Sequence, residues 1–211
     1  GGRWGAFADS AFLRGFDFYL GLYRDGLAPV YGNTDVANLF QEFERGLFVF
    51  YITGPWNIGE FGRRLPAELQ DDWATAPLPG PTGAETGLST AGGSSLVLFR
   101  ESEHPEEAWK FIEFLSRPEI QVRFYQLTGD LPPRLEAWDD TVLSRNDKAH
   151  AFREQLERVQ PVPLVPEIEL IMAKLIEYAE QSIRGGVPPA EAMRRLDAEV
   201  NNILEKRRWM L

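Results

Sequence analysis

The sequence contains no cysteine and only two histidines, and these scarcities exclude several kinds of chemistry at once. Without thiols the chain has no disulfide, no thiolate metal site and no cysteine nucleophile, although this does not identify its compartment. His104 precedes a proline at a predicted helix start, and His150 lies in a polar helical stretch. Neither histidine belongs to a nucleophile, metal or phosphate-loop pattern. We therefore predict no catalytic residue, no metal and no cofactor.

Long apolar runs and basic clusters are also missing. The longest apolar run, Leu47–Ile52, has the length of a strand and falls far short of the ~20 residues of a membrane span. The net charge is −10, and no cluster of Lys and Arg alternates with aromatics, so nucleic-acid binding is disfavoured. The first residues contain neither an initiator Met nor a charged-then-apolar signal segment. Either a leading segment is removed, or the chain is part of a longer protein.

What is present is enough hydrophobic sequence for a core, arranged mainly with helical spacing. The chain has 211 residues, of which 44% are hydrophobic, and this suits one large or two small domains. Apolar residues recur at helical spacing after Asp9, after Asp35, from Pro105, from Ser116, after Asn146, from Ile168 and from Pro189. In the helix from Pro105 we expect a buried stripe formed by Ala108, Phe111, Ile112 and Leu115.

Two stretches are predicted to be strands, and two others to be extended connections. Leu47–Thr53 is apolar on both faces, which suits a strand inside an α/β sheet, and Gly54-Pro55 ends it just before Trp56. Ser94–Phe99 is the second predicted strand, entered through Gly92-Gly93. Residues 76–88 and 131–134 are rich in proline, so we expect extended crossing segments or hinges there.

Three stretches, in this order and spacing, resemble the family 1 extracellular solute-binding proteins, the group that contains maltose-binding protein. The first is Phe43-Glu44-Arg45-Gly46, an apolar strand and then Thr53-Gly54-Pro55-Trp56-Asn57. The second is Gly92-Gly93-Ser94-Ser95-Leu96 followed by Ala108-Trp109-Lys110-Phe111-Ile112-Glu113-Phe114-Leu115. The third is Gly129-Asp130-Leu131-Pro132-Pro133-Arg134. The resemblance covers the chain from about Phe7 to Leu204.

The resemblance implies an α/β fold of the type II periplasmic-binding-protein kind, in which two lobes close on a ligand. It assigns residues 1–78 and 131–211 to a helix-rich second lobe. Residues 79–85 and 129–134 would be hinge crossings. Residues 86–128 would pack on a first lobe whose main part lies outside this chain, so we expect a fragment of a two-lobe protein.

Trp56 is the strongest candidate for ligand contact. A sugar ring has an apolar face of C–H groups that a flat indole can cover, at about 0.5–1.5 kcal/mol beyond area burial by analogy with aromatic pairs. Gly54-Pro55 would hold the ring at the strand tip, where clefts of α/β folds lie. A tryptophan buried beneath a turn is the alternative. Trp4, Trp73, Trp109 and Trp138 are assigned to packing, and Trp209 to a helix-end anchor.

Six further residues are weaker candidates for ligand binding. Gly92 and Gly93 would let a ligand approach the backbone closely, although a turn before a strand explains them equally well. Many relatives carry an aromatic at the next position, whereas this chain has Ser94, which suggests a smaller or more polar contact. Arg134 could direct two donors at vicinal hydroxyls or a carboxylate, or could be an ordinary surface arginine. Tyr51 and Asn57 flank the Trp56 turn.

By resemblance, the protein is the substrate-binding component of an ABC importer and not an enzyme. It would bind a sugar or oligosaccharide, dock on a membrane permease and be a monomer at full length. It would work outside the cytoplasm, in the periplasm or lipid-anchored at the cell surface, with its signal segment outside this chain. The alternatives are a glycosidase that uses tryptophan platforms and a helical protein-interaction module. The adjacent pairs Asp71-Asp72 and Asp139-Asp140 do not form the two opposed carboxyl groups that a glycosidase needs.

Overall fold

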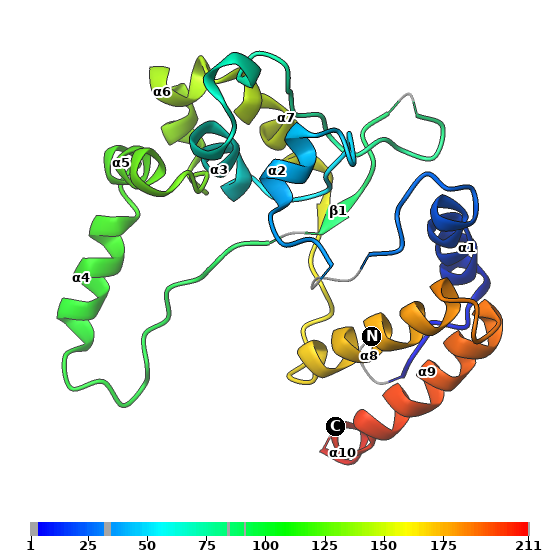
Figure 1. Ribbon diagram of the computed structural model, residues 1–211. Coiled ribbons are helices and arrows are strands. Elements are labelled where there is room, and N and C mark those ends of the chain that lie inside the picture. Colours follow the sequence, from blue (N-terminus) through cyan, green and yellow to red (C-terminus); the bar gives the residue numbers. More distant parts are fainter. Residues whose placement is uncertain (1–3, 32–34, 84, 91, 211) are drawn as a thin grey trace. The chain divides into compact units, whose positions relative to one another are not determined.

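The computed structural model describes residues 4–31, 35–83, 85–90 and 92–210, and most of its regular structure is helical (Figure 1). The chain divides into two compact units. One comprises Gly1–Ala37 with Val162–Leu211, and the other comprises Asn38–Pro161. No helix among the described residues has both the length and the apolar character that crossing a bilayer would require.

The unit made from the two ends of the chain is a group of packed helices. It contains α1 (Ser10–Arg24), α8 (Ile168–Ile183), α9 (Pro189–Ile203) and the short α10 (Glu205–Met210). α8 and α9 pack on one another, and both contact α1, because each carries apolar residues at helical spacing. The core consists of Phe16, Leu20, Val165, Ile171, Ala192, Met193, Leu196, Val200 and Leu204. α1 and α8 end where predicted, and the glycines that follow them, Gly26 and Gly185, have φ angles of 70° and 76°.

The beginning of the described chain is fixed to α9 by polar contacts. The Asp197 carboxylate accepts hydrogen bonds from the backbone N–H groups of Phe7 and Ala8, at 2.7 and 2.9 Å. Asn201 Oδ1 accepts another from the Gly5 N–H at 2.9 Å. These bonds satisfy donors just before α1 and tie segments that are almost two hundred residues apart.

A small ionic network on α8 and α9 gives this unit a predictable response to acid. Glu199 accepts hydrogen bonds from Lys174 at 3.0 Å and from the Tyr178 hydroxyl at 2.9 Å, and Lys174 also pairs with Glu177. The bond from Lys174, and then that from Tyr178, lowers the pKa of Glu199 below its ordinary value of 4.5. Because the folded state holds the carboxylate charged, its stabilisation is complete above that ordinary value and is lost as the pH falls through the lowered pKa.

We therefore expect Glu199→Gln to destabilise the chain near pH 7 and to matter progressively less as the pH falls below 4.5. Urea unfolding of both proteins across this range would measure the difference in their free energies of unfolding. A difference that stays constant with pH would show that the carboxylate charge at Glu199 contributes nothing.

The second unit is built around two clusters. It contains helices α2 (Leu39–Glu44), α3 (Trp56–Arg64), α4 (Pro105–Leu115), α5 (Pro118–Thr128), α6 (Thr141–Ser144) and α7 (Asp147–Gln155), and the 3-10 helices η1 (Ala67–Leu69), η2 (Leu135–Asp139) and η3 (Leu156–Arg158). In one cluster the buried Phe61 ring contacts the rings of Phe40, Phe43, Tyr51 and Trp73. The other consists of Val122, Tyr125, Ala137, Trp138, Leu143 and Ala149. Ile58 and Leu131 pack against this second cluster.

The described strands are short, and one predicted crossing folds back on itself. β1 (Ser89–Thr90) pairs in parallel with β2 (Val159–Gln160). The described residues of the proline-rich stretch at 76–88 form neither a helix nor a central strand, as predicted, but Pro79 and Thr86 form an antiparallel bridge that closes a turn. Gln155 of α7 holds this turn, accepting from the Leu78 N–H at 2.8 Å and donating to the Gly87 carbonyl at 2.9 Å. A hinge role for this stretch remains a prediction.

The prediction of two apolar strands is wrong for this chain. Residues 47–53 and 94–99 have no strand pairing and are largely exposed, up to 88% for Phe50 and 75% for Phe99. Within the described part of the chain, no backbone hydrogen bond reaches residues 48–53 or 92–98. A strand needs a neighbouring backbone to pair with, and neither segment finds one here.

The prediction about α4 is half right. The helix begins at Pro105 and ends at Leu115, with Glu106 and Glu107 in the first turn as expected. The stripe predicted to be buried is not, because α4 contains no buried residue and Phe111 is 59% exposed. Two tryptophans assigned to packing, Trp4 and Trp109, are likewise exposed, although the Arg208 guanidinium lies 4.2 Å from the Trp4 ring centre.

Candidate functional site

Trp56 is presented to solvent at the beginning of α3. Ile58, Phe61 and Leu65 lie on the side of the helix that faces the two clusters of this unit. Because successive residues of a helix are rotated by ~100°, Trp56 lies on the opposite side. As a result the indole is 54% exposed. This helix was not predicted: residues beyond Gly54-Pro55 were treated as a turn. Gly59 and Gly62 lower helix propensity, which hid the pattern.

The indole lies directly over Gly54. A Cβ added at Gly54 would overlap carbons of the six-membered ring of Trp56, so only a glycine leaves room for the ring in this position. Pro55 next to it has φ −62°, which suits its place before the first residue of a helix. The sequence Gly54-Pro55-Trp56 therefore fixes the position of the Trp56 indole, which we call the platform. The sequence analysis did not predict that Gly54 supports this ring.

Of the two other residues predicted near Trp56, only Asn57 takes part in the same turn. Asn57 Nδ2 donates to Thr53 Oγ1 at 2.5 Å, and the Asn57 N–H donates to the Gly54 carbonyl at 3.2 Å, which together close the turn before α3. Tyr51 stacks on Phe61 with ring centres 6.4 Å apart and planes 20° from parallel, and it remains 40% exposed. Because Phe61 lies on the other side of α3 from Trp56, the binding role of Tyr51 remains a prediction.

The remaining predicted residues lie elsewhere in the second unit. Gly92, Gly93 and Ser94 are in an exposed, irregular stretch, and a Cβ at either glycine would meet no atom of a distant residue within 4 Å. Gly93 has a φ of 130°, a conformation that favours glycine. Among the described residues, no backbone hydrogen bond involves Gly92, Gly93 or Ser94. Their binding role remains a prediction.

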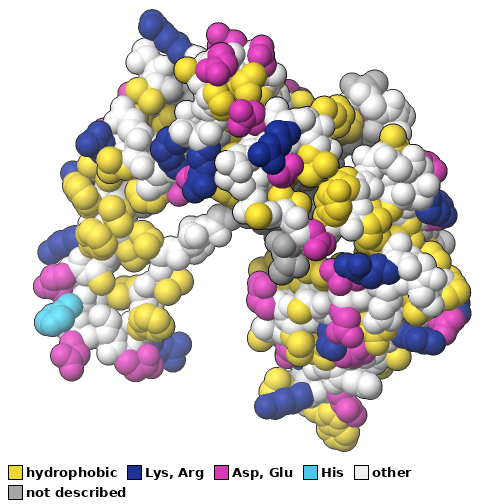
Figure 2. Space-filling view, in the orientation of Figure 1, with side chains coloured by type: hydrophobic (Ala, Val, Ile, Leu, Met, Phe, Trp, Pro, Cys, Tyr) yellow, Lys and Arg dark blue, Asp and Glu magenta, His cyan; other side chains and the backbone are white. Residues whose placement is uncertain are grey.

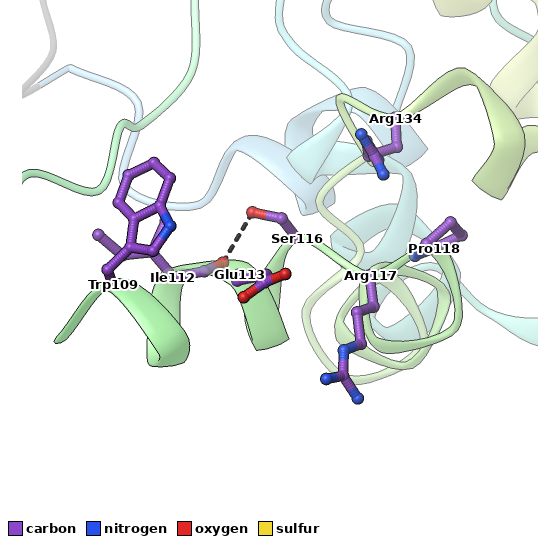
Figure 3. Close-up of a pocket in the computed structure, with 7 residues that line it drawn as sticks. All are labelled: Trp109, Ile112, Glu113, Ser116, Arg117, Pro118 and Arg134. Carbon is purple, nitrogen blue, oxygen red and sulfur yellow. Dashed lines mark hydrogen bonds between the residues drawn. The ribbon is translucent and has the colours of Figure 1, made fainter. Parts of the chain in front are cut away.

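Arg134 lines a shallow pocket at the junction of α4 and α5 (Figure 3). The pocket has a volume of about 340 Å³, and its other lining residues are Trp109, Ile112, Glu113, Ser116, Arg117 and Pro118. The Ser116 hydroxyl donates to the Ile112 carbonyl at 2.7 Å, which ends α4 next to the pocket. Arg134 itself has one distant ion pair, with Glu136 at 3.8 Å, so its guanidinium is available to other partners.

One close backbone contact joins α3 to the crossing at 129–134. Gly129 follows α5 with a φ of 82°, and a Cβ placed on it would lie 3.8 Å from the Cα and N of Gly59 in α3. No side chain separates the two backbones at this point. The helix that carries Trp56 therefore touches the segment predicted to be a hinge.

No metal-binding cluster accompanies these residues in the part of the chain that the structure describes. Within the described ranges, no three His, Asp or Glu side chains come together closely enough to hold a metal ion. The exposed platform, the amide beside it and the separate guanidinium are groups that bind polar ligands through stacking and hydrogen bonds.

We expect Gly54→Ala to displace the Trp56 indole, because the new methyl group would occupy the space of the ring. The matched control is Gly62→Ala in the same helix, where an added Cβ meets nothing within 4 Å. Near-ultraviolet circular dichroism should change in the first variant and not in the second. Equal spectra for Gly54→Ala and the parent protein would contradict this placement of the ring.

Sequence similarity over most of the chain assigns it to a known class of proteins. The model of the family described as bacterial extracellular solute-binding protein matches residues 8–151. Because this match covers more than half of the chain, the chain belongs to that family. The predicted resemblance is confirmed, and the type II periplasmic-binding-protein fold with it.

Individual relatives are consistent with this assignment. The structure of the sugar-binding protein MalE from Xanthomonas citri is 44% identical and superposes with a TM-score of 0.93, covering 99% of this chain and 52% of that protein. A Brucella abortus protein described as a binding protein is 30% identical over 92% of this chain and 46% of its own length. The maltodextrin-binding protein MdxE of Bacillus subtilis is 27% identical over 61% of this chain and 30% of its length.

The chain spans about half the length of these relatives, as the shares of 52% and 46% state. They are binding proteins by description, and the family is extracellular. The expectation that this chain corresponds to part of a two-lobe protein agrees with these lengths.

Proposed function

We propose that this chain supplies one wall of a sugar-binding cleft in the substrate-binding component of an ABC importer. The observation that carries the proposal is the exposed Trp56 indole, which lies over Gly54, with the Asn57 amide in the same turn. The ligand class is a sugar or oligosaccharide, in keeping with the sugar and maltodextrin named for the relatives. Residues at the platform would cover the C–H face of the sugar and leave its hydroxyls to polar groups.

Binding in this scheme requires contacts from two lobes. Residues 1–78 and 131–211 are assigned to the second lobe, 79–85 and 129–134 to hinges, and 86–128 to the side of the first lobe. A ligand favours the closed form only by its difference in affinity for the two forms, so a wall from each lobe is needed. Gly92, Gly93, Ser94 and Arg134 would contribute from outside the platform. This chain alone should therefore bind weakly.

The closed complex would deliver its cargo to a membrane permease outside the cytoplasm, and the full-length protein would act as a monomer. A net charge of −10 fits a protein that does not bind nucleic acid. We propose no enzymatic activity. The nearest alternative, glycoside hydrolysis, needs two carboxyl groups facing each other across a sugar bond, and neither Trp56 nor Asn57 supplies a carboxylate.

A thermal-shift screen against a panel of sugars tests this function. The sample is this chain fused to the part of the Xanthomonas citri relative that it does not span, so that both walls are present. A ligand that binds only the native state raises the melting temperature, by an amount that grows with its concentration. Maltose, maltodextrins and galacto-oligosaccharides are the first probes. No shift with any sugar, or release of free monosaccharide from an oligosaccharide, would refute a transport-binding role.

A further inference from the structure

Helix α10 turns its apolar side chains outward, in contrast to α9, which it follows. Lys206, Trp209 and Met210 are spaced i, i+3 and i+4, so they share one face of the helix. Trp209 is 85% exposed and Met210 is 66% exposed. A surface helix usually buries its apolar residues against the core, as α9 does with Leu196 and Val200. The large apolar side chains of α10 face solvent instead.

The arginines of α10 lie on its inner side, next to a second exposed tryptophan. Arg207 and Arg208 are half-buried, on the same side as Leu204, which is 2% exposed. The Arg208 guanidinium lies 4.2 Å from the centre of the Trp4 ring, and Trp4 is itself 65% exposed. Two exposed indoles therefore lie on either side of a basic side chain at one end of this unit.

One exposed indole is ordinary on a protein surface, but this combination is typical of one environment. Trp4 and Trp209 accompany three consecutive cations, residues 206–208. Indoles and long basic side chains gather at membrane–water interfaces, because their apolar bodies enter the lipid boundary while their polar ends stay hydrated. Figure 2 shows hydrophobic and basic side chains next to one another where Figure 1 labels α10. The composition of this face thus fits the surface of a bilayer.

The net charge of the whole chain does not oppose such a contact. At physiological salt, exposed charges interact over only about 8 Å, so the charge near the contact matters more than the total of −10. Glu205 is the one acidic residue of α10, against three basic ones. Among the described residues of this unit, the ion pairs use Arg24, Lys174 and Arg195. The exposed ammonium of Lys206 is therefore available to an anionic partner.

We propose that Trp4, Trp209 and Met210, together with the cations at 206–208, form an interfacial face that binds the surface of an anionic phospholipid bilayer. The apolar side chains enter the headgroup boundary, and the cations lie near the lipid phosphates. With six residues, α10 lies on the membrane and does not cross it. A second copy of this chain fits the face less well, because a twofold contact would bring the same cations of both copies together.

Co-flotation of this chain with vesicles tests the electrostatic part of the proposal. The vesicles contain phosphatidylglycerol and phosphatidylcholine in equal amounts, or phosphatidylcholine alone. We expect binding to the anionic vesicles, weakening as added salt screens the charges. Each basic residue near an anionic surface contributes about fivefold in affinity, so Lys206→Glu, which changes two charges, should lower the partition coefficient about 25-fold. Lys110→Glu is the matched control, because it makes the same change in net charge at an exposed position of α4.

A second pair of variants tests the apolar part. Trp209→Ala should lower the partition coefficient about 10-fold, because the indole no longer leaves water on binding. Trp109→Ala removes a 59% exposed indole from α4 of the other unit and should bind as the parent protein does. Lys206 and Trp209 are exposed, so variants at both positions should keep the melting temperature of the parent protein.

Four results would overturn the proposal. One is equal binding to neutral and anionic vesicles, and another is equal binding by Trp209→Ala and Trp109→Ala. A third is loss of vesicle binding when the chain is fused to the remaining part of the Xanthomonas citri relative, which would mean that the face is covered at full length. The fourth is self-association without vesicles that Trp209→Ala abolishes, which would assign the face to a second copy. No sugar takes part in these measurements, so their failure would not affect the proposed function.

Discussion

Replacing Trp56 with alanine is expected to weaken sugar binding by about 10- to 100-fold, which is about 1.4–2.8 kcal/mol. The indole has more than half of its surface exposed, and most of that surface would be covered by a stacked sugar ring. Loss of a central aromatic anchor removes both the buried apolar area and the ring-specific attraction. Calorimetry on the fusion protein, with the best sugar from the screen, measures the change in affinity.

Two control variants make this result specific to the ring. Trp56→Phe retains an aromatic face and should lose less affinity than Trp56→Ala. Trp209→Ala removes an equally large, 85% exposed indole from α10 of the other unit, and should leave the affinity unchanged. If Trp56→Ala binds the sugar as tightly as the parent protein, Trp56 is not part of the binding site. The fold assignment would not be affected by that result.

The second large effect is expected in the core of the unit formed by the chain ends. Leu196 of α9 is fully buried among Phe16, Ile171, Met193 and Val200. Leu196→Ala removes buried methyl groups and leaves a cavity in a packed interior, at a cost of about 2–5 kcal/mol. Because net stabilities are only about 5–15 kcal/mol, this is a large share of the total.

Urea unfolding, followed by far-ultraviolet circular dichroism, measures this loss. The matched control is Arg194→Ala, two positions earlier in α9, where the side chain is exposed and the change should stay within about 0.5 kcal/mol. A Leu196→Ala variant as stable as Arg194→Ala would mean that this helix is not packed as described.

The helices could be predicted from the sequence, because the information for a helix is local. Spacing of apolar residues, Pro105 and Pro189 at helix starts, and Gly26, Gly46 and Gly129 after helix ends all act within a few residues. α3, α6 and α10 are exceptions: the two glycines of α3 obscured the pattern, and α6 and α10 have only four and six residues. Asn146 caps α7 as predicted, accepting from the Lys148 N–H at 3.1 Å.

The strands could not be predicted in this way, because pairing depends on distant backbone. Leu47–Thr53 and Ser94–Phe99 have the composition of interior strands, yet composition supplies no neighbour. The same limit affects α4, whose apolar stripe was identified correctly from its spacing but whose burial was not. Whether an apolar face is buried depends on the surface that packs against it, and the sequence of the face alone does not specify that surface.

The candidate site also has a part that depends on local sequence and a part that depends on long-range packing. Gly54-Pro55-Trp56 is a local arrangement, and the exposure of the indole follows from the turn and the helix start. Asn57 follows Trp56 directly and closes the same turn, whereas Tyr51 packs on Phe61. Gly92, Gly93, Ser94 and Arg134 could converge with it only through longer-range packing, which this chain does not display.

The two unpaired apolar segments, residues 47–53 and 94–99, also affect the tendency of the isolated chain to aggregate. Leu47–Ile52 contains no proline and no charge, the composition that promotes intermolecular β-pairing. Mutual repulsion from a net charge of −10 opposes that pairing, and it vanishes as the pH approaches the isoelectric point of about 4.8. Light scattering by the chain alone should therefore rise steeply on mild acidification. It should remain low for the fusion protein, in which neighbouring backbone would pair with these segments.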